Sequence, residues 1–367
     1  MSSDDWFLFS CCQQGAEPAL KAELAHWLPE SRFAYSRAGF CTFKIPASQS
    51  AEQLFQLPLV FARTRAVSLG TVQGVLPEQA AAVAELIATV SGFKQLHVWS
   101  RDSDLPGNNG FEPGPPTSAA ETGQLLVSSL DKLQPGLLGE QPVGINRNAR
   151  PGQKILDLVQ VEPDQWWVGW HLATGVSSRW AGGVHARSLP PHAVSRAYLK
   201  IDEAIRWSRL PVKAGHRCAE VGSAPGGSCQ ALLDRGLKVV GIDPAEMDPR
   251  VVALDGFVHI KKRLKAVPRR DFNNIDWLFV DANVAPRQML DDVEQLVAHK
   301  SVRLRGMLLT LKLLQWQIAA EIPTFIERVR SWGFRDVRVR QLAHNRREVC
   351  LAALKSRSFR RSVPRRS

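Results

Sequence analysis

The chain has 367 residues, 44% of them apolar, and a formal net charge of +12. This length predicts two or three domains with cores of their own, and the positive excess favours a polyanionic partner. The sequence has no run of 18 apolar residues and no basic N-terminal region followed by an apolar run, so we expect no membrane span, no Sec-type signal and a cytoplasmic location.

The six cysteines contain no C-x-x-C pair, and Cys218 and Cys350 lie in apolar, strand-like runs. This pattern predicts reduced, mostly buried thiols and no metal site.

The first part of the chain alternates strand and helix patterns. Residues 6–45 predict a strand, a helix from about residue 17 and a second strand, a βαβ start that suits a small α/β or ferredoxin-like unit. Residues 51–70 predict a helix and an arginine-bearing strand, and residues 77–90 a helix opened by Pro77.

A strand at 96–100 is followed by a Gly- and Pro-rich loop at 101–118, a further helix, and two strands around a turn within 157–174. Four tryptophans lie in and just after this last segment: Trp166, Trp167, Trp170 and Trp180. Alternation along a strand usually directs such side chains into the protein, although stacking on RNA bases is an alternative.

After a linker near 181–194, the pattern becomes that of a doubly wound α/β domain. Helices are expected at 195–210, 228–235, 286–300 and 316–331. Strands are expected at 218–221, 239–243, 257–260, 276–282, 306–314, 334–342 and 348–354. The last two strands are joined by too few residues for a parallel crossover, so they should form an antiparallel hairpin.

The stretch from 216 to 243 has the composition of a ligand-binding βαβ unit. Glycines after the first strand allow close approach to the backbone, and Asp243 after the second strand can accept hydrogen bonds from a ribose. A dinucleotide site would require G-x-G-x-x-G, but Ser223 and Ala224 follow Gly222. The order E-V-G-x-x-P-G-G instead resembles the first motif of class I methyltransferases, which bind S-adenosylmethionine.

Four charged residues stand out in this half of the chain: Lys200, Asp281, Lys312 and Glu348. Lys312 lies among leucines, so its ammonium must either reach solvent at a strand end or enter a polar pocket. Taken singly, Lys200 is explained as a surface lysine, Glu348 as an acid at a strand edge and Asp281 as a cap of the following turn. Together, at one edge of the sheet, they would form a charge-balanced site beside the glycine loop.

Several motifs carry a more specific resemblance: SRAYLKIDEA, EVGSAPGG, WLFVDA, LTLKL and HNRREV. Together they resemble FtsJ-type RNA 2′-O-methyltransferases. Two front segments, FARTRAVSLG and WWVGWHLATGVSSRWAGGVHARSLPPHAV, and the total length are similar to the bacterial ribosomal large-subunit methyltransferase M family.

The resemblance implies an α/β fold whose C-terminal part is a class I, Rossmann-like methyltransferase with a mixed seven-stranded sheet. It also implies a ferredoxin-like unit at 1–70, a THUMP-like RNA-binding domain at 71–180, the linker at 181–194 and the methyltransferase domain at 195–355. The substrate would be a 2′-hydroxyl of 23S ribosomal RNA, at a cytidine and before full assembly of the subunit, and the enzyme would act as a monomer.

The same resemblance implies Lys312 as proton acceptor, with Lys200, Asp281 and Glu348 completing a catalytic tetrad. We expect burial and the Lys200 charge to lower the pKa of Lys312, with the two acids opposing that shift. Contacts to S-adenosylmethionine are implied for Ser195, Glu220, Gly222, Ala224, Pro225, Gly226, Gly227, Asp243 and Asp281.

The chain departs from the family pattern in three places. Glu220 stands where Asp is common, and Ser228 stands where an aromatic residue is usual. The acid expected near Leu264 to contact adenine is missing, so either another acid such as Asp271 replaces it or apolar contacts and backbone hold the adenine. The missing acid motivates the alternative of a non-catalytic RNA-binding protein. A base N-methyltransferase is a second alternative, but residues 281–284 lack the prolines and the aromatic residue of its signature.

The last 13 residues hold six Lys or Arg and no acid, and residues 261–270 form a second basic cluster. We predict that residues 356–367 are a disordered basic tail that contacts nucleic acid, with a solubilising surface as the alternative.

Overall fold

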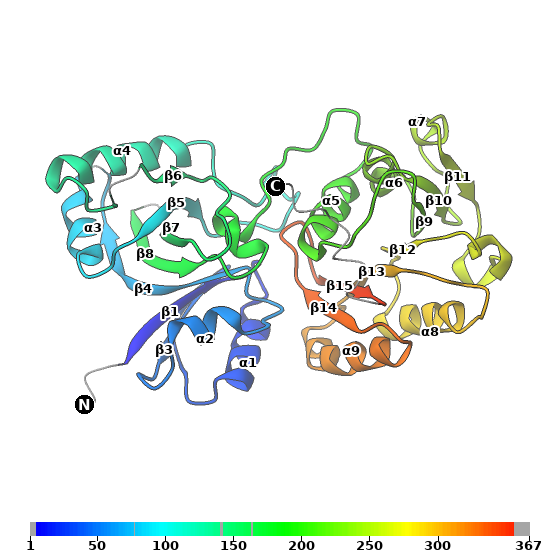
Figure 1. Ribbon diagram of the computed structural model, residues 1–367, viewed down its shortest axis with the longest axis horizontal. Helices are drawn as coiled ribbons and strands as arrows, with labels where there is room; N and C mark the ends of the chain where they lie inside the picture. The colour runs from blue at the N-terminus through cyan, green and yellow to red at the C-terminus, as the bar shows by residue number, and fades with distance from the viewer. Residues whose placement is uncertain (1–4, 77, 140–141, 163, 356–367) are drawn as a thin grey trace, which may run out of the picture. The chain divides into compact units, whose positions relative to one another are not determined.

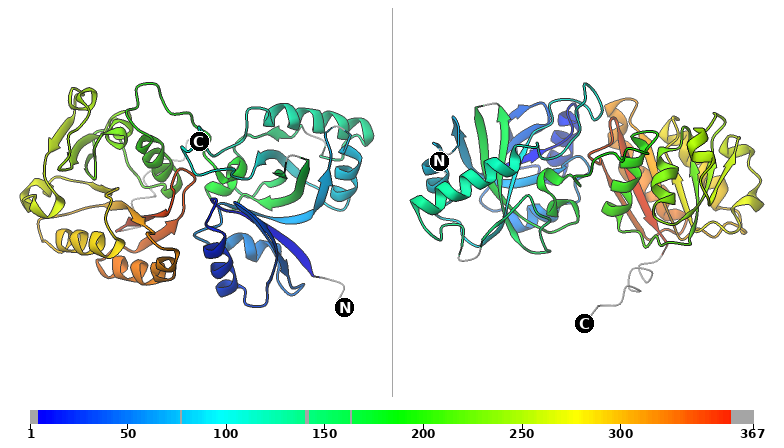
Figure 2. Two further views of the ribbon diagram at one scale, coloured as in Figure 1. Left: turned by 180° about the vertical axis from the view of Figure 1, so that it is seen from behind. Right: turned by 90° about the horizontal axis from the view of Figure 1, so that it is seen from above.

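The computed structural model describes residues 5–76, 78–139, 142–162 and 164–355. The chain divides into two compact units, residues 1–186 and 187–367, each built on a β-sheet of its own (Figures 1 and 2). The predicted tail at 356–367 and Pro77 lie outside the described residues. No helix in the described ranges is long and apolar enough to cross a lipid bilayer.

One eight-stranded sheet forms the front unit, in the order β2-β3-β1-β4-β8-β7-β5-β6. Its strands are β1 (Trp6–Cys11), β2 (Arg32–Arg37), β3 (Phe40–Ile45), β4 (Thr64–Gln73), β5 (Phe93–Ser100), β6 (Gly144–Ile145), β7 (Lys154–Glu162) and β8 (Gln165–Leu172). Its helices are α1 (Glu17–Trp27), α2 (Ala51–Gln56), α3 (Ala80–Ile87) and α4 (Ala119–Leu133), with short 3-10 turns η1 (Ser177–Arg179) and η2 (Ala181–Gly183). Strand β4 pairs with β1 on one side and β8 on the other, so all eight strands belong to one continuous sheet.

The expected βαβ start is wrong in one respect. Strand β2 lies between α1 and β3 in sequence, and β3 pairs antiparallel with both β1 and β2. The segment Arg32–Arg37 is mostly exposed and carries arginine at both ends, so it lacks the apolar alternation by which a strand is recognised. The other elements expected in the front unit are present.

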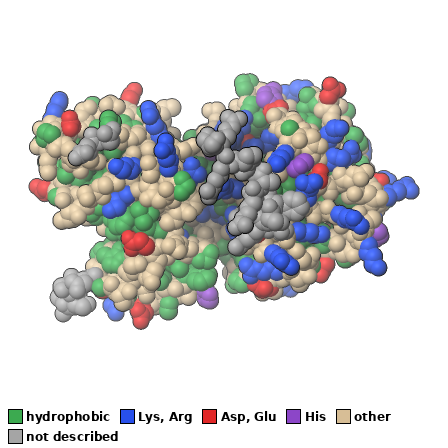
Figure 3. All heavy atoms as spheres, in the orientation of Figure 1, with side chains coloured by type: hydrophobic (Ala, Val, Ile, Leu, Met, Phe, Trp, Pro, Cys, Tyr) green, Lys and Arg blue, Asp and Glu red, His purple; other side chains and the backbone are tan. Residues whose placement is uncertain are grey.

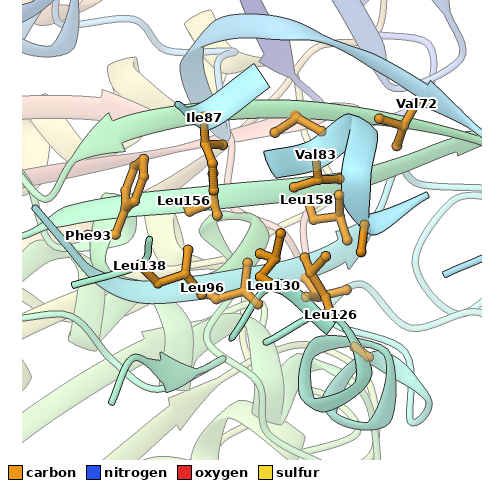
Figure 4. Packing of buried hydrophobic residues seen from close by; sticks show 14 residues of the cluster. Val72, Val83, Ile87, Phe93, Leu96, Leu126, Leu130, Leu138, Leu156 and Leu158 are labelled. Carbon is orange, nitrogen blue, oxygen red and sulfur yellow. The ribbon is translucent and has the colours of Figure 1, made fainter. Parts of the chain in front are cut away.

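The main core of the front unit lies between two helices and the sheet. Val83 and Ile87 of α3 and Leu126 and Leu130 of α4 are fully buried, and Figure 4 shows them together with buried side chains of the strands. Their spacing of four residues places each pair on one face of its helix. Burying a side chain of this kind stabilises the fold by about 1.5–3 kcal/mol, so this cluster is a principal source of the unit's stability.

The tryptophans of this unit are held by protein contacts. Trp166 and Trp170 pack against the core just described, Trp167 stacks on Tyr35 with ring centroids 5.2 Å apart, and Trp180 is buried. Trp180 is therefore a core residue, and Trp166, Trp167 and Trp170 are partly buried against the protein.

A mixed seven-stranded sheet forms the second unit, in the order β11-β10-β9-β12-β13-β15-β14. Its strands are β9 (Arg217–Val221), β10 (Lys238–Ile242), β11 (Phe257–Ile260), β12 (Trp277–Val280), β13 (Gly306–Lys312), β14 (Asp336–Arg340) and β15 (Glu348–Leu354). Its helices are α5 (Ala197–Ser208), α6 (Gly227–Leu233), α7 (Pro249–Val252), α8 (Pro286–Val297) and α9 (Ile322–Ser331), with 3-10 turns η3 (Leu264–Ala266), η4 (Arg269–Phe272) and η5 (Trp316–Glu321).

The first five strands of this sheet are parallel, and β15 runs antiparallel to both β13 and β14. Helices α5 and α6 cover one face, and α8 and α9 cover the other (Figure 1). The doubly wound fold and its terminal hairpin are therefore confirmed. The strand order reverses between β9 and β12, and at such a switch point an open α/β sheet binds its ligands.

All six cysteines are buried and none is in a disulfide.

Candidate active site

The glycine loop between β9 and α6 has a backbone that side chains would disrupt. Gly222 has φ of +81°, and a Cβ there would lie 2.5 Å from the carbonyl oxygen of Asp281. Gly226, the residue before the first turn of α6, has φ of +124°. Glycine adopts these angles without strain, so the loop can pass directly beneath the end of β12.

Gly227 and Ser195 form the next part of the site. A Cβ on Gly227 would collide with the hydroxyl oxygen of Ser195, which is itself buried and has no hydrogen-bond partner among the described residues. A buried polar atom without a partner is uncommon and calls for an explanation. The Ser195 hydroxyl is therefore available to hydrogen-bond a polar ligand bound against the glycine loop.

Asp243 lies at the end of β10, opposite the glycine loop. Its carboxylate accepts hydrogen bonds from the backbone N–H of Ala224 at 3.2 Å and of Ala245 at 2.8 Å. Carboxylate oxygens can accept further hydrogen bonds, so the side chain both shapes the loop and keeps acceptor capacity for a ribose.

Glu220 is the last but one residue of β9 and is almost completely buried. Burial raises the pKa of Glu220 to about 8, and its Oε2 has no partner among the described residues. A cavity of about 20 Å³, lined by Glu220, Ser228, Lys200, Asp281 and Asn345 among others, separates it from the charged cluster. This volume is room for about one water molecule.

The four charged residues expected to form a tetrad meet at the edge of the sheet where β12 and β13 end and β15 begins. Lys312, at the end of β13, places its Nζ 2.8 Å from Asp281 Oδ1 and 2.6 Å from Glu348 Oε2. Lys200, on α5, forms an ion pair with Glu348 and lies 3.6 Å from Asp281 Oδ2. Each acid therefore contacts both lysines.

Burial and charge act in opposite directions on this cluster. Burial lowers the pKa of Lys312, but the charges of Asp281 and Glu348 and their hydrogen bonds outweigh it, so the pKa is raised from its ordinary value. The expectation of a lowered pKa is therefore wrong for the free protein. Burial likewise raises the pKa of Glu348, but Lys200 and Lys312 outweigh it and bring it down to about 2.

Two residues that the sequence did not single out support the cluster. Glu203 is buried on α5, one turn beyond Lys200, and accepts hydrogen bonds from the backbone N–H of Ala343 at 2.9 Å and of His344 at 3.0 Å. In the same loop, the Asn345 side chain donates to Glu348 Oε1 at 3.4 Å. A carboxylate on the apolar face of a helix was the available signal for Glu203.

Two residues were singled out in the region where the sequence lacks the expected acid. Leu264 is buried in η3, and Asp271 lies in η4, 4.0 Å from Arg270.

Comparison with known proteins finds a family match within the second unit. Residues 193–347 match the FtsJ-like methyltransferase family. Two proteins named "Ribosomal RNA large subunit methyltransferase M" align over 95% of this chain and 99% of their own length, one from Xanthomonas oryzae at 27% identity and one from Xanthomonas campestris at 28%. TrmN from Thermus thermophilus aligns over 95% of this chain and 99% of its own at 14% identity, with a TM-score of 0.35, too low to support a conclusion.

Methyltransferases of this family take their methyl group from S-adenosylmethionine. The glycine loop, the unpartnered Ser195 hydroxyl and Asp243 suit that cofactor. The chain thus contains an FtsJ-like methyltransferase domain in residues 193–347, and it is an S-adenosylmethionine-dependent methyltransferase.

Proposed function

We propose that this protein methylates a ribose 2′-hydroxyl of large-subunit ribosomal RNA. The observation that carries the proposal is the cluster in which Lys312 contacts both Asp281 and Glu348 beside the glycine loop. The names of the Xanthomonas relatives support ribosomal RNA as the substrate class. A cytidine target on RNA that is not yet assembled is part of the proposal.

The residues of the loop hold the methyl donor. The residues that would hold it are Ser195, Gly222, Ala224, Pro225, Gly226, Gly227 and Asp243, together with Glu220 and Asp281. S-adenosylmethionine supplies an electrophilic methyl group on a sulfonium.

Lys312 removes the proton from the ribose hydroxyl, which is a poor nucleophile while it keeps that proton. Asp281 and Glu348 fix the position of the Lys312 amine, and Lys200 balances their charge and holds Glu348 from the other side. Because the pKa of Lys312 is raised in the free protein, the neutral amine is a minor form at neutral pH. Its population, and with it the rate, should increase as the pH rises.

The front unit grips RNA, with a ferredoxin-like part in residues 1–70 and a THUMP-like part in residues 71–180. Residues 181–194 link it to the catalytic domain at 195–355, and the enzyme acts in the cytoplasm as a monomer. RNA helices are recognised by shape, phosphates and 2′-hydroxyls, and single-stranded nucleotides by contacts to the splayed base. We assign the first kind of contact to the front unit and the second to the catalytic domain.

A base N-methyltransferase fits the chain less well. Its signature needs prolines and an aromatic residue to hold a planar amine, and residues 281–284 are Asp, Ala, Asn and Val. A non-catalytic RNA-binding protein would not require two lysines and two acids in mutual contact.

The experiment maps both ribose and base methylation on ribosomal RNA from cells with the protein, without it, and with the Lys312→Gln variant in its place. We expect one 2′-O-methylated nucleotide of 23S RNA to lose its mark in both altered strains. A new unmethylated base instead of a ribose would establish the base methyltransferase, and an unchanged map would refute the proposal.

A further inference from the structure

The front unit has a second concave site, separate from the glycine loop. The hollow has a volume of about 830 Å³ and lies between the start of β5, the helix α4, and β6 with the loop 146–153 that follows it. Three cations, Lys94, Arg147 and Arg150, line it. The lining residues within the described ranges include no acid.

The three cations are available to a ligand. Lys94, Arg147 and Arg150 are exposed, and none of their side chains has an ion pair or hydrogen bond to another residue in the described part of the chain. Other arginines of this protein do have partners. Arg63, Arg206, Arg235 and Arg328, for example, each form an ion pair with a carboxylate. On the face drawn in Figure 3, Lys and Arg side chains lie around the position that β6 has in Figure 1.

The loop that presents the arginines is fastened to the sheet. Asn146 has φ of +51°, and its side chain accepts from Val98 N at 2.8 Å and donates to Val98 O at 2.9 Å. His97 Nε2 donates to the carbonyl oxygen of Arg147 at 3.1 Å, and Ala149 N donates to Arg179 O at 2.9 Å. The backbone is therefore fixed while the side chains of residues 147, 148 and 150 face outward.

His97 can hold Arg147 across the physiological pH range. Burial lowers the pKa of His97 to about 4, so the ring is neutral and its one N–H is committed to the Arg147 carbonyl. A binding site made of pre-positioned groups loses less conformational entropy when a ligand binds.

The other residues that line the hollow indicate which part of an RNA chain it can bind. Four amide side chains, Gln95, Gln124, Asn148 and Gln153, stand among the cations, and the lining has no aromatic residue in the described ranges. Cations and amides suit phosphates and ribose hydroxyls, whereas stacking of bases would require aromatic rings. The hollow should thus bind an RNA backbone with little preference for sequence.

We propose that Lys94, Arg147 and Arg150 form an RNA-backbone site in the front unit, which holds the substrate while the methyltransferase domain acts on it. This site rests on the proposed function, since it takes RNA to be the substrate. The site binds the RNA substrate and takes no part in the methyl-transfer step.

The test compares the full-length double variant Arg147→Gln/Arg150→Gln with the wild type and with a matched control, Arg32→Gln/Lys132→Gln. Arg32 and Lys132 are exposed residues of the same unit that do not line the hollow, so the control removes the same charge. The probe is a fluorescent single-stranded RNA of mixed sequence, and its Kd is measured against salt concentration. A third variant, Arg147→Lys/Arg150→Lys, keeps the charge.

Two lost phosphate contacts should reduce the slope of log Kd against log salt by about 1.4 and weaken binding roughly 25-fold at 0.1 M salt. The control and the lysine variant should stay near the wild type in both the slope and the Kd. If Arg147→Gln/Arg150→Gln and its control gave equal slopes of log Kd against log salt, the proposed RNA-backbone site would be refuted. Methyl transfer by the wild type is measured separately, so that outcome would leave the proposed function standing.

Discussion

Lys312 and Glu348 are direct partners across the antiparallel pair of β13 and β15, and their side chains meet in an ion pair of 2.6 Å. Lys312 ends its strand and Glu348 begins the other, so the pair stands at the edge of the sheet. Because both side chains are largely buried, the pair should hold one geometry rather than exchange with water.

Lys312→Gln should reduce the rate of methyl transfer by about 10²–10⁴-fold, the usual contribution of a general base. The Kd for S-adenosylmethionine should change little, because Lys312 is not part of the glycine loop. Single-turnover transfer and calorimetry measure the two quantities. Lys238→Gln, which alters an exposed lysine of β10, is the control and should behave as the wild type. Near-normal transfer by Lys312→Gln would remove this residue from the base role.

The pH dependence of kcat/KM follows from the charge around Lys312. This ratio reports the free enzyme, in which the pKa of Lys312 is raised by Asp281 and Glu348. Log kcat/KM should therefore rise with a slope near one from neutral pH to above pH 9, measured in short assays that limit RNA hydrolysis. A plateau near pH 7 would mean that burial, and not the two carboxylates, controls this lysine.

Glu203 should act as a positioning residue. Glu203→Gln keeps one acceptor for the two N–H groups of residues 343 and 344, and Glu203→Ala keeps none. We expect kcat to fall about tenfold in the first variant and further in the second, with the Kd of S-adenosylmethionine unchanged.

Each N–H left unsatisfied should cost about 1–3 kcal/mol of stability. Glu327→Gln, which changes an exposed acid of α9, is the control. Loss of stability without any loss of kcat in the two Glu203 variants would show that the contact is only structural.

Glu220 should make the methyltransferase unit less stable as the pH rises. Its pKa is raised to about 8 by burial, above the ordinary value of 4.5, so the folded state keeps a proton that the unfolded state releases. The stability is therefore complete below pH 4.5 and declines between pH 4.5 and 8. The total loss is at most about 5 kcal/mol, from 1.36 kcal/mol for each pKa unit.

Glu220→Gln cannot ionise and should not show this decline. Urea unfolding at pH 5 and pH 8, followed by circular dichroism, would measure this decline. The difference between variant and wild type should grow in favour of the variant at pH 8, and a constant difference would place an ionised Glu220 in the folded protein.

Local patterns were sufficient for most elements of both sheets, since apolar periodicity and glycine positions are properties of short segments. They failed at β2, where the exposed segment Arg32–Arg37 lacks an apolar face. They also could not reveal the role of Glu203, because its carboxylate binds two N–H groups about 140 residues away in the sequence.

The doubly wound fold, the glycine loop and the four charged residues, one on a helix and three at strand ends, could be predicted from local patterns in the sequence. The folded structure was needed to show that each acid contacts both lysines, and that the pKa of Lys312 is therefore raised instead of lowered. The physical reason is that electrostatic energy depends on distances between side chains from α5, β12, β13 and β15, which are set by strand order and register. The cations of the hollow in the front unit became a candidate site for the same reason, since their lack of partners is a property of the folded chain.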